Sequence, residues 1–261
     1  MIKFIASDLD GTILRNGAQA VDDSLIEVVG RLVEQGYLFA PASGRQITSL
    51  KRLFGPIADK LMYIAENGAL VEYRGEVIAK TPMDKQLALD LIHDFIKIPH
   101  CEALVSGQHT AYIKPKSEAF EHRMTKVVNY HTTKVERFED IPEDILKVSV
   151  CDMSGIVNSQ DYLMKMWGTN PKLEAAVSGE LFLDFMDSNV SKGNALIEIQ
   201  KHFHIHPDEC MVFGDNYNDI SMLDAATESY VMEKAVEDVK KHGKYVTDWV
   251  EATLRKEFSV K

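Results

Sequence analysis

Short apolar segments alternate with helical patterns over the first 65 residues, and this alternation constrains the fold more than any other feature of the chain. Strands are predicted at residues 2–6, 37–40 and 61–65, where β-favouring apolar residues are consecutive. Between them, residues 23–35 and 45–54 carry apolar side chains at the spacing of one helix face. Because strands that alternate with helices form βαβ units, we expect an α/β fold with a parallel sheet and helices on both of its faces.

The alternation stops after residue 68 and returns near residue 188. A hairpin is predicted around Arg74-Gly75, and Pro82 then interrupts the chain. The next hundred residues have a mixed pattern, with helices predicted at 84–97, 117–129 and 155–166 and strands at 102–106, 110–113, 146–151 and 181–185. After residue 191, helices are predicted at 192–203 and 218–224 and strands at 210–213 and 229–232. We therefore expect residues 1–82 and 188–261 to form one domain, and residues 83–187 to form an inserted α+β domain with an antiparallel sheet.

Composition and charge exclude several classes of protein. The chain has 261 residues, with 29 Lys and Arg against 40 Asp and Glu, which gives a formal net charge of −11. It lacks the basic surface that nucleic-acid binding requires. Its cysteines are few, far apart and odd in number, which argues against a disulfide framework or a cysteine zinc site. No segment approaches the roughly 20 apolar residues of a membrane span. We expect a cytoplasmic monomer or homodimer that binds neither nucleic acid nor membranes.

Two aspartates directly follow the first predicted strand, in the segment Asp8-Leu9-Asp10-Gly11-Thr12. In an open α/β sheet the carboxyl ends of the strands face the ligand crevice. Asp8 can act there as a nucleophile or metal ligand and Asp10 as an acid or base, while Gly11 permits a sharp turn and Thr12 offers a hydroxyl. A turn that merely ends the strand is the alternative. Four fixed residue types arise by chance at only about one in 160,000 positions, which favours the functional interpretation.

Two further segments place anion-binding groups at the starts of predicted helices. Ser43, Gly44 and Arg45 follow the second strand, where a hydroxyl and backbone N–H groups can hold a phosphate. An ordinary N-cap serine is the alternative. Lys192 stands in the first turn of a later helix, where the helix dipole prefers an acid. This placement indicates that the ammonium has another anion to neutralise, unless Lys192 is simply a surface lysine.

A second acidic cluster, from Gly214 to Asp219, follows another apolar strand. Asp215 and Asp219 lie four residues apart across a junction between loop and helix, so they can converge on one cation. Carboxylate oxygens near a phosphate suit Mg²⁺. A capping loop is the alternative, but two acidic clusters at the same edge of a sheet favour a metal site.

The four segments resemble, in their order along the chain, the motifs of the haloacid dehalogenase-like phosphohydrolases. They are Asp8 to Thr12, Ser43-Gly44-Arg45, Lys192 and residues 214–219. The insert resembles the type 2 cap of that family. The runs Glu66-Asn67-Gly68-Ala69 and Ser191-Lys192-Gly193-Asn194-Ala195-Leu196 resemble its Cof-like branch in particular. The resemblance implies a Rossmann-like catalytic core formed by residues 1–82 and 188–261, and a mobile cap, residues 83–187, that determines substrate specificity.

The resemblance also implies a Mg²⁺-dependent phosphatase that hydrolyses phosphomonoesters through an aspartyl-phosphate. Asp8 matches the nucleophile of the family, Asp10 the general acid and base, and Lys192 the residue that neutralises Asp8 and the phosphoryl oxygens. The metal ligands implied are Asp8, the Asp10 backbone carbonyl, Asp215 and Asp219. The residues implied for substrate and phosphate binding are Thr12, Ser43, Gly44, Arg45, Asn67 and Asn218. For Arg45 the alternative is that it only holds the loop of the second motif.

The chain departs from the Cof-like pattern at a few positions. Ser43 stands where threonine is usual, which is a chemically neutral exchange. Glu233-Lys234 replaces Gly-Asn, and a later glycine is absent around residues 250–252. These changes remove no catalytic group, so they bear on substrate access more than on the reaction.

We therefore expect a phosphatase for small phosphorylated metabolites, with sugar phosphates as the leading class. Nucleotides, a flavin phosphate and pyridoxal phosphate are other candidates. A sugar phosphomutase and a non-catalytic phosphometabolite-binding protein are the alternative functions. Asp8 and Asp10 argue against the binding protein, because a sensor needs no acid or base.

Overall fold

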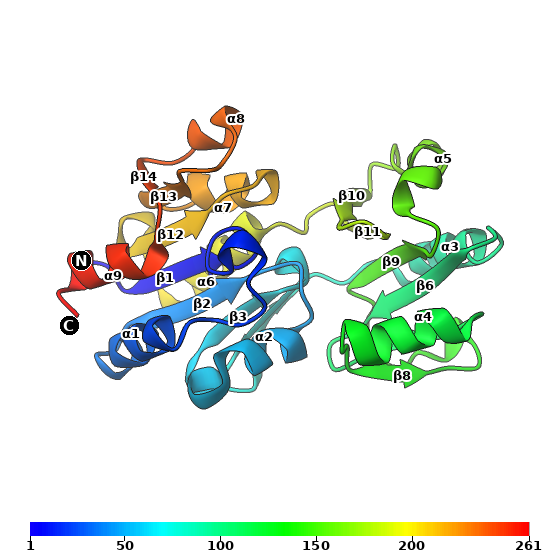
Figure 1. The fold of residues 1–261 in the computed structure, drawn as a ribbon, viewed down its shortest axis with the longest axis horizontal. Coiled ribbons are helices and arrows are strands. Elements are labelled where there is room, and N and C mark those ends of the chain that lie inside the picture. The colour runs from blue at the N-terminus through cyan, green and yellow to red at the C-terminus, as the bar shows by residue number, and fades with distance from the viewer. Residues whose placement is uncertain (261) are drawn as a thin grey trace. The chain divides into compact units, whose positions relative to one another are not determined.

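The computed structural model describes residues 1–260, which form two compact units (Figure 1). The first unit comprises Met1–Lys80 together with the described residues from Ser191 onward, and the second comprises Thr81–Val190. We call them the core unit and the inserted unit. The core unit contains every motif singled out in the sequence.

The core unit is built on a sheet with strand order β14-β13-β12-β1-β2-β3-β4-β5. The strands from β14 to β3 run parallel, as predicted, whereas β4 and β5 extend the sheet as an antiparallel hairpin. Arg74 and Gly75 both adopt positive φ angles (53° and 83°), as a tight hairpin turn requires. The strands are β1 (Phe4–Asp8), β2 (Leu38–Ala42), β3 (Met62–Ala65), β4 (Leu70–Tyr73), β5 (Glu76–Lys80), β12 (Cys210–Gly214), β13 (Glu228–Met232) and β14 (Tyr245–Thr247).

Helices cover both faces of this sheet, which confirms the α/β prediction. Every residue of β1 is buried, as expected for a central parallel strand. One face packs against α6 (Lys192–Phe203), α7 (Ile220–Asp224) and α8 (Glu237–Lys240). The other face packs against α1 (Asp23–Glu34) and α2 (Ile47–Phe54), and α9 (Val250–Phe258) lies beside α1 (Figure 1). In α1 the buried residues recur at helical spacing: Leu25, Val28, Val29 and Leu32.

The inserted unit contains a second sheet with strand order β10-β11-β9-β6-β7-β8. The predicted antiparallel arrangement holds for most of it, but β7 and β8 pair in parallel. Strands β8 and β10 were not predicted, because they lie at the two edges of the sheet, are largely exposed and lack a buried apolar run. The elements are α3 (Lys85–Phe95), β6 (Cys101–Ser106), β7 (Ala111–Ile113), α4 (Glu118–His122), β8 (Thr132–Lys134), β9 (Lys147–Asp152), α5 (Gln160–Trp167), β10 (Leu173–Ser178) and β11 (Phe182–Asp187).

Helices α3 and α5 bury their apolar sides on one face of this second sheet, and α4 covers part of the other. Short 3-10 or π turns complete the chain, the longest being Gly55–Lys60 and Arg123–Val127. No helix among residues 1–260 is long and apolar enough to cross a bilayer.

Candidate active site

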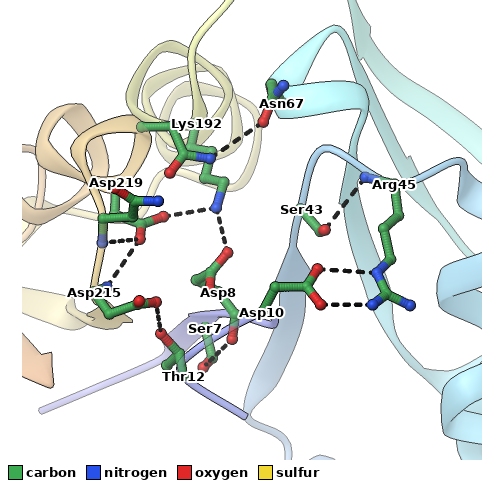
Figure 2. Close-up of polar contacts among 12 residues, drawn as sticks. Ser7, Asp8, Asp10, Thr12, Ser43, Arg45, Asn67, Lys192, Asp215 and Asp219 are labelled. Atoms are coloured by element: carbon green, nitrogen blue, oxygen red, sulfur yellow. Dashed lines mark hydrogen bonds and ion pairs between the residues drawn. The ribbon is translucent and has the colours of Figure 1, made fainter. Parts of the chain in front are cut away.

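The predicted site residues lie at the carboxyl edge of the core sheet (Figure 2). Asp8 is the last residue of β1, Ser43 follows β2, and Asp215 follows β12. Asn67 lies in the turn Glu66–Gly68 directly after β3. These strands run parallel, so their carboxyl ends open at one edge of the sheet. Segments more than 200 residues apart in the chain thus meet in one site.

Lys192 is the first residue of α6 and is fully buried at the centre of this site. Its Nζ donates to Asp8 Oδ1 at 2.5 Å and to Asp219 Oδ1 at 2.6 Å. Burial by itself lowers the pKa of this ammonium, but the carboxylates of Asp219 and Asp8 outweigh that effect and raise it. Lys192 is therefore no surface lysine, and its ammonium is paired with two buried carboxylates.

Asp8, Asp215 and Asp219 each point a carboxylate oxygen toward a common point. These oxygens lie within 4.8 Å of one another. Asp219 is held by the backbone, because its Oδ2 accepts hydrogen bonds from Asp215 N (2.9 Å) and Asn216 N (3.0 Å). Asp215 is held by Thr12, whose hydroxyl donates to Asp215 Oδ1 at 2.6 Å. Thr12 therefore supports the acidic cluster, although the sequence suggested a substrate contact.

Gly11 is required by the close approach of Asp215. Its φ is +100°, and a Cβ at this position would lie 2.3 Å from Asp215 Oδ2. Both facts exclude a side chain without displacement of the carboxylate.

The charge of this cluster fits a divalent cation. The carboxylates of Asp8, Asp215 and Asp219 carry −3 against +1 from Lys192, which leaves −2. Asp8 Oδ2 is buried and has no hydrogen-bond partner among the described residues. Burial and the neighbouring carboxylate of Asp219 raise the pKa of Asp8 despite the opposing effect of Lys192, and burial likewise raises the pKa of Asp215. Hard carboxylate oxygens in this number and spacing are the ligands that Mg²⁺ prefers.

A group of small polar residues lies beside the acidic cluster. Ser43 Oγ accepts a hydrogen bond from Arg45 N at 3.2 Å, and Asn218 Nδ2 donates to Asn67 Oδ1 at 3.3 Å. A Cβ on Gly44 would lie 3.0 Å from Asn67 Oδ1, so this glycine lets the two loops approach closely. The hydroxyl, the side-chain amides and the backbone N–H groups form a neutral surface of the kind that binds a phosphoryl group.

Asp10 and Arg45 form a separate pair, outside the carboxylate cluster. Arg45 Nε donates to Asp10 Oδ2 at 2.9 Å and Nη2 donates to Asp10 Oδ1 at 2.5 Å (Figure 2). The Asp10 side chain is 55% exposed, in contrast to the buried Asp8 and Asp219. An exposed carboxylate beside a buried one is suited to proton exchange with water and with a departing group.

Two supports of the site, the conformation of the turn Glu66–Gly68 and the contact of Ser221, were not predicted from the sequence. Glu66 and Asn67 both have positive φ angles (49° and 58°), and Gly68 continues this left-handed turn. A Cβ on Gly68 would lie 2.3 Å from the Ser191 carbonyl oxygen, so the turn fits directly against the start of α6. Ser221 Oγ accepts a hydrogen bond from Gly193 N at 3.1 Å. The glycines in the sequence could have indicated the close approach of these loops, whereas nothing in the sequence indicates the contact of Ser221.

Lys234 of the pair Glu233-Lys234, where the Cof-like pattern has Gly-Asn, makes a contact in the structure. Lys234 Nζ donates to Asn16 Oδ1 at 3.0 Å, which ties its loop to the turn Arg15–Gly17 that follows the Asp8–Thr12 segment. The exchange therefore links two loops of the core unit and leaves the acidic cluster unchanged.

Comparisons with known proteins find relatives that match nearly the whole chain. The sequence pattern of the haloacid dehalogenase-like hydrolases matches residues 5–253. The chain is 28% identical to the 5-amino-6-(5-phospho-D-ribitylamino)uracil phosphatase YbjI of Escherichia coli, over 94% of this chain and 90% of that protein. A crystal structure from Eubacterium rectale superposes with a TM-score of 0.86 at 28% identity and covers 98% of this chain and 99% of its own.

The subclass IIB sugar phosphatase BT4131 superposes with a TM-score of 0.76 at 23% identity, over 98% of this chain and 99% of that one, and at this identity the likeness shows the fold alone. The relatives that match over most of their length include several named phosphatases. The chain therefore belongs to the haloacid dehalogenase-like hydrolases, in their Cof-like branch.

Proposed function

We propose that this chain is a Mg²⁺-dependent phosphatase that acts on small phosphorylated metabolites, foremost sugar and polyol phosphates, through an aspartyl-phosphate on Asp8. The observation that carries this proposal is the environment of Asp8. One of its oxygens is fixed by Lys192, while the other is buried without a partner among the described residues. A buried carboxylate oxygen in this state calls for a ligand, which an incoming phosphoryl group and its cation would supply.

In the first step, a carboxylate oxygen of Asp8 attacks phosphorus, and the bond from phosphorus to the leaving oxygen breaks. Asp10, in its acid form, gives its proton to that oxygen, so the leaving group departs as a neutral alcohol. Lys192 neutralises Asp8 and the phosphoryl oxygens, and Ser43, Asn67 and Asn218 bind the phosphoryl group. Asp8, Asp215 and Asp219 would hold Mg²⁺, which would offset the remaining negative charge.

In the second step, water attacks phosphorus and the bond between phosphorus and Asp8 breaks. Asp10, now a carboxylate, takes a proton from the attacking water, which restores both side chains and releases inorganic phosphate. The balance of protons over the two steps thus needs only Asp10 and water.

Two further proposals concern selectivity. The inserted unit, Thr81–Val190, would determine which leaving group is accepted. The substrate of the E. coli relative carries a phosphorylated ribityl chain, and BT4131 is a sugar phosphatase, so a polyhydroxylated leaving group is the leading class.

Phosphate release tests the proposal. Sugar phosphates, nucleotides, flavin mononucleotide and pyridoxal phosphate would be supplied to the wild type and to Asp8→Asn, with Mg²⁺ and with a chelator. We expect metal-dependent release, fastest with sugar or polyol phosphates, and none from Asp8→Asn. Release that survives in the variant would overturn the role of Asp8. Isomerised sugar phosphate without free phosphate would identify a mutase instead.

A further inference from the structure

Arg45 holds the carboxylate of Asp10 by both of its oxygens. The guanidinium donates through Nε and Nη2 at 2.9 and 2.5 Å, which is the bidentate arrangement in which the two groups are nearly coplanar (Figure 2). The Arg45 side chain is 31% exposed and that of Asp10 is 55% exposed. A half-exposed aspartate on a loop otherwise samples several rotamers, so this pair determines where the Asp10 oxygens point.

The backbone of Arg45 is itself fixed by two neighbouring strand ends. Its N–H donates to Ser43 Oγ at 3.2 Å, and its carbonyl oxygen accepts from Glu66 N at 3.1 Å. Ser43 follows β2 and Glu66 follows β3. Asp10 lies after β1, so Arg45 connects the loop that carries Asp10 to rigid points on the adjacent strands.

We propose that Arg45 is a positioning residue that acts through Asp10: it orients the Asp10 carboxyl for proton transfer to the leaving oxygen. This inference rests on the proposed phosphatase function and extends it to a residue that the sequence suggested for substrate binding. The planar fork of arginine fixes both the direction and the plane of the carboxyl group, whereas a lysine ammonium fixes neither.

The role predicts a dependence on the leaving group. An alkyl phosphate releases a strongly basic alkoxide, which needs the Asp10 proton as the bond to phosphorus breaks. p-Nitrophenyl phosphate releases a stabilised phenolate, which departs with little protonation. A misdirected Asp10 therefore slows the first reaction far more than the second. The ratio kcat/KM reports this first step, because it covers events up to the irreversible transfer of the phosphoryl group to Asp8.

The experiment compares Arg45→Met with the control variant Arg52→Met. Arg52 belongs to the same loop-and-helix segment, but it donates to Ser49 Oγ in α2 and lies away from the acidic cluster. We expect Arg45→Met to lower kcat/KM for glycerol phosphate by about 10- to 100-fold. For p-nitrophenyl phosphate we expect kcat/KM to fall by no more than about 3-fold, because that reaction needs little general acid catalysis. Arg45→Lys should recover only part of the loss, and Arg52→Met should change neither value.

A double variant separates positioning from direct substrate binding. If Arg45 acts through Asp10, then adding Arg45→Met to Asp10→Asn produces no further loss with glycerol phosphate. An equal loss with both substrates, or a loss that persists in the Asp10→Asn background, would overturn the proposal and assign Arg45 to the substrate. Wild type that hydrolyses neither compound would contradict the phosphatase function itself. An unchanged thermal unfolding midpoint in Arg45→Met would show that the variant is folded.

Discussion

Replacement of Lys192 by methionine should expose how much the site depends on one buried charge. In the wild type, Nζ lies 2.5 Å from Asp8 and 2.6 Å from Asp219, and the side chains of Lys192 and Asp219 are fully buried. Methionine matches the length of the lysine stem and has a similar helix propensity. The variant therefore removes the ammonium and leaves two buried carboxylates without their cation.

The expected cost is about 3–5 kcal/mol of the free energy of unfolding, the range for removal of one partner from a buried pair. Lys201→Met is the matched control, because Lys201 is also in α6 and pairs with Glu198 at 2.8 Å, but both side chains are more than half exposed. Such exposed pairs contribute about 0–1 kcal/mol. The two variants thus remove the same chemical group from the same helix at different depths.

Urea unfolding at pH 8 and at pH 5 measures the loss in the free energy of unfolding and shows whether it comes from the buried carboxylates. Burial already raises the pKa of Asp8, and loss of Lys192 removes the main opposing effect. A raised carboxyl pKa means that the folded state binds the proton more tightly than the unfolded state, so stability increases as pH falls through that pKa. The deficit of Lys192→Met should therefore be smaller at pH 5 than at pH 8. A loss no larger than that of Lys201→Met, or one independent of pH, would refute this reasoning.

The remaining predictions concern the metal, the turn and the thiols. Asp215→Ala should raise the Mg²⁺ concentration for half-maximal activation by at least about 10-fold, whereas Asp208→Ala, at an exposed position, should not change it. Equal Mg²⁺ titrations of the two variants would show that Asp215 is not a metal ligand. Gly11→Ala should lower kcat/KM by about 100-fold, because the new Cβ displaces Asp215. Gly36 has a similar φ of +96° but no atom near the position of a Cβ, so Gly36→Ala should retain activity. Steady-state kinetics of both variants test this prediction. Burial raises the pKa of Cys101, that of Cys151 to about 12 and that of Cys210 to about 11. These thiols should therefore remain protonated and unreactive toward a disulfide reagent at pH 8 and react after denaturation, and fast labelling of the native protein would contradict their burial.

The parts of the fold and site that follow strand periodicity were predictable from the sequence. Asp8 and Asp215 each follow a run of buried apolar residues, and parallel strands bring their carboxyl ends to one edge. Lys192 was recognisable because a cation is unfavourable in the first turn of a helix. The structure adds that its partners are Asp8 and Asp219 together.

The rest depends on contacts between side chains distant in the sequence, which no local pattern records. Thr12 and Asp215 are 203 residues apart, and Asn16 and Lys234 are 218 apart. The pairing of Arg45 with Asp10 depends on the spacing of two strands and on a side-chain rotamer. In the inserted unit, β8 and β10 lie at sheet edges, where neighbouring strands rather than apolar residues stabilise the extended chain.

The central claim is that Asp8 forms a covalent bond to phosphorus, and acid-quenched mass spectrometry tests it most directly. Asp10→Asn removes the base of the second step, and p-nitrophenyl phosphate needs little protonation in the first step, so with this substrate the intermediate should accumulate. After a brief incubation with p-nitrophenyl phosphate and Mg²⁺, the Asp8 peptide of the Asp10→Asn protein should gain the mass of one phosphoryl group, and the Asp8→Asn protein should gain none. Phosphate release by the wild type with no phosphoryl group on that peptide, or with one on a different peptide, would contradict the account.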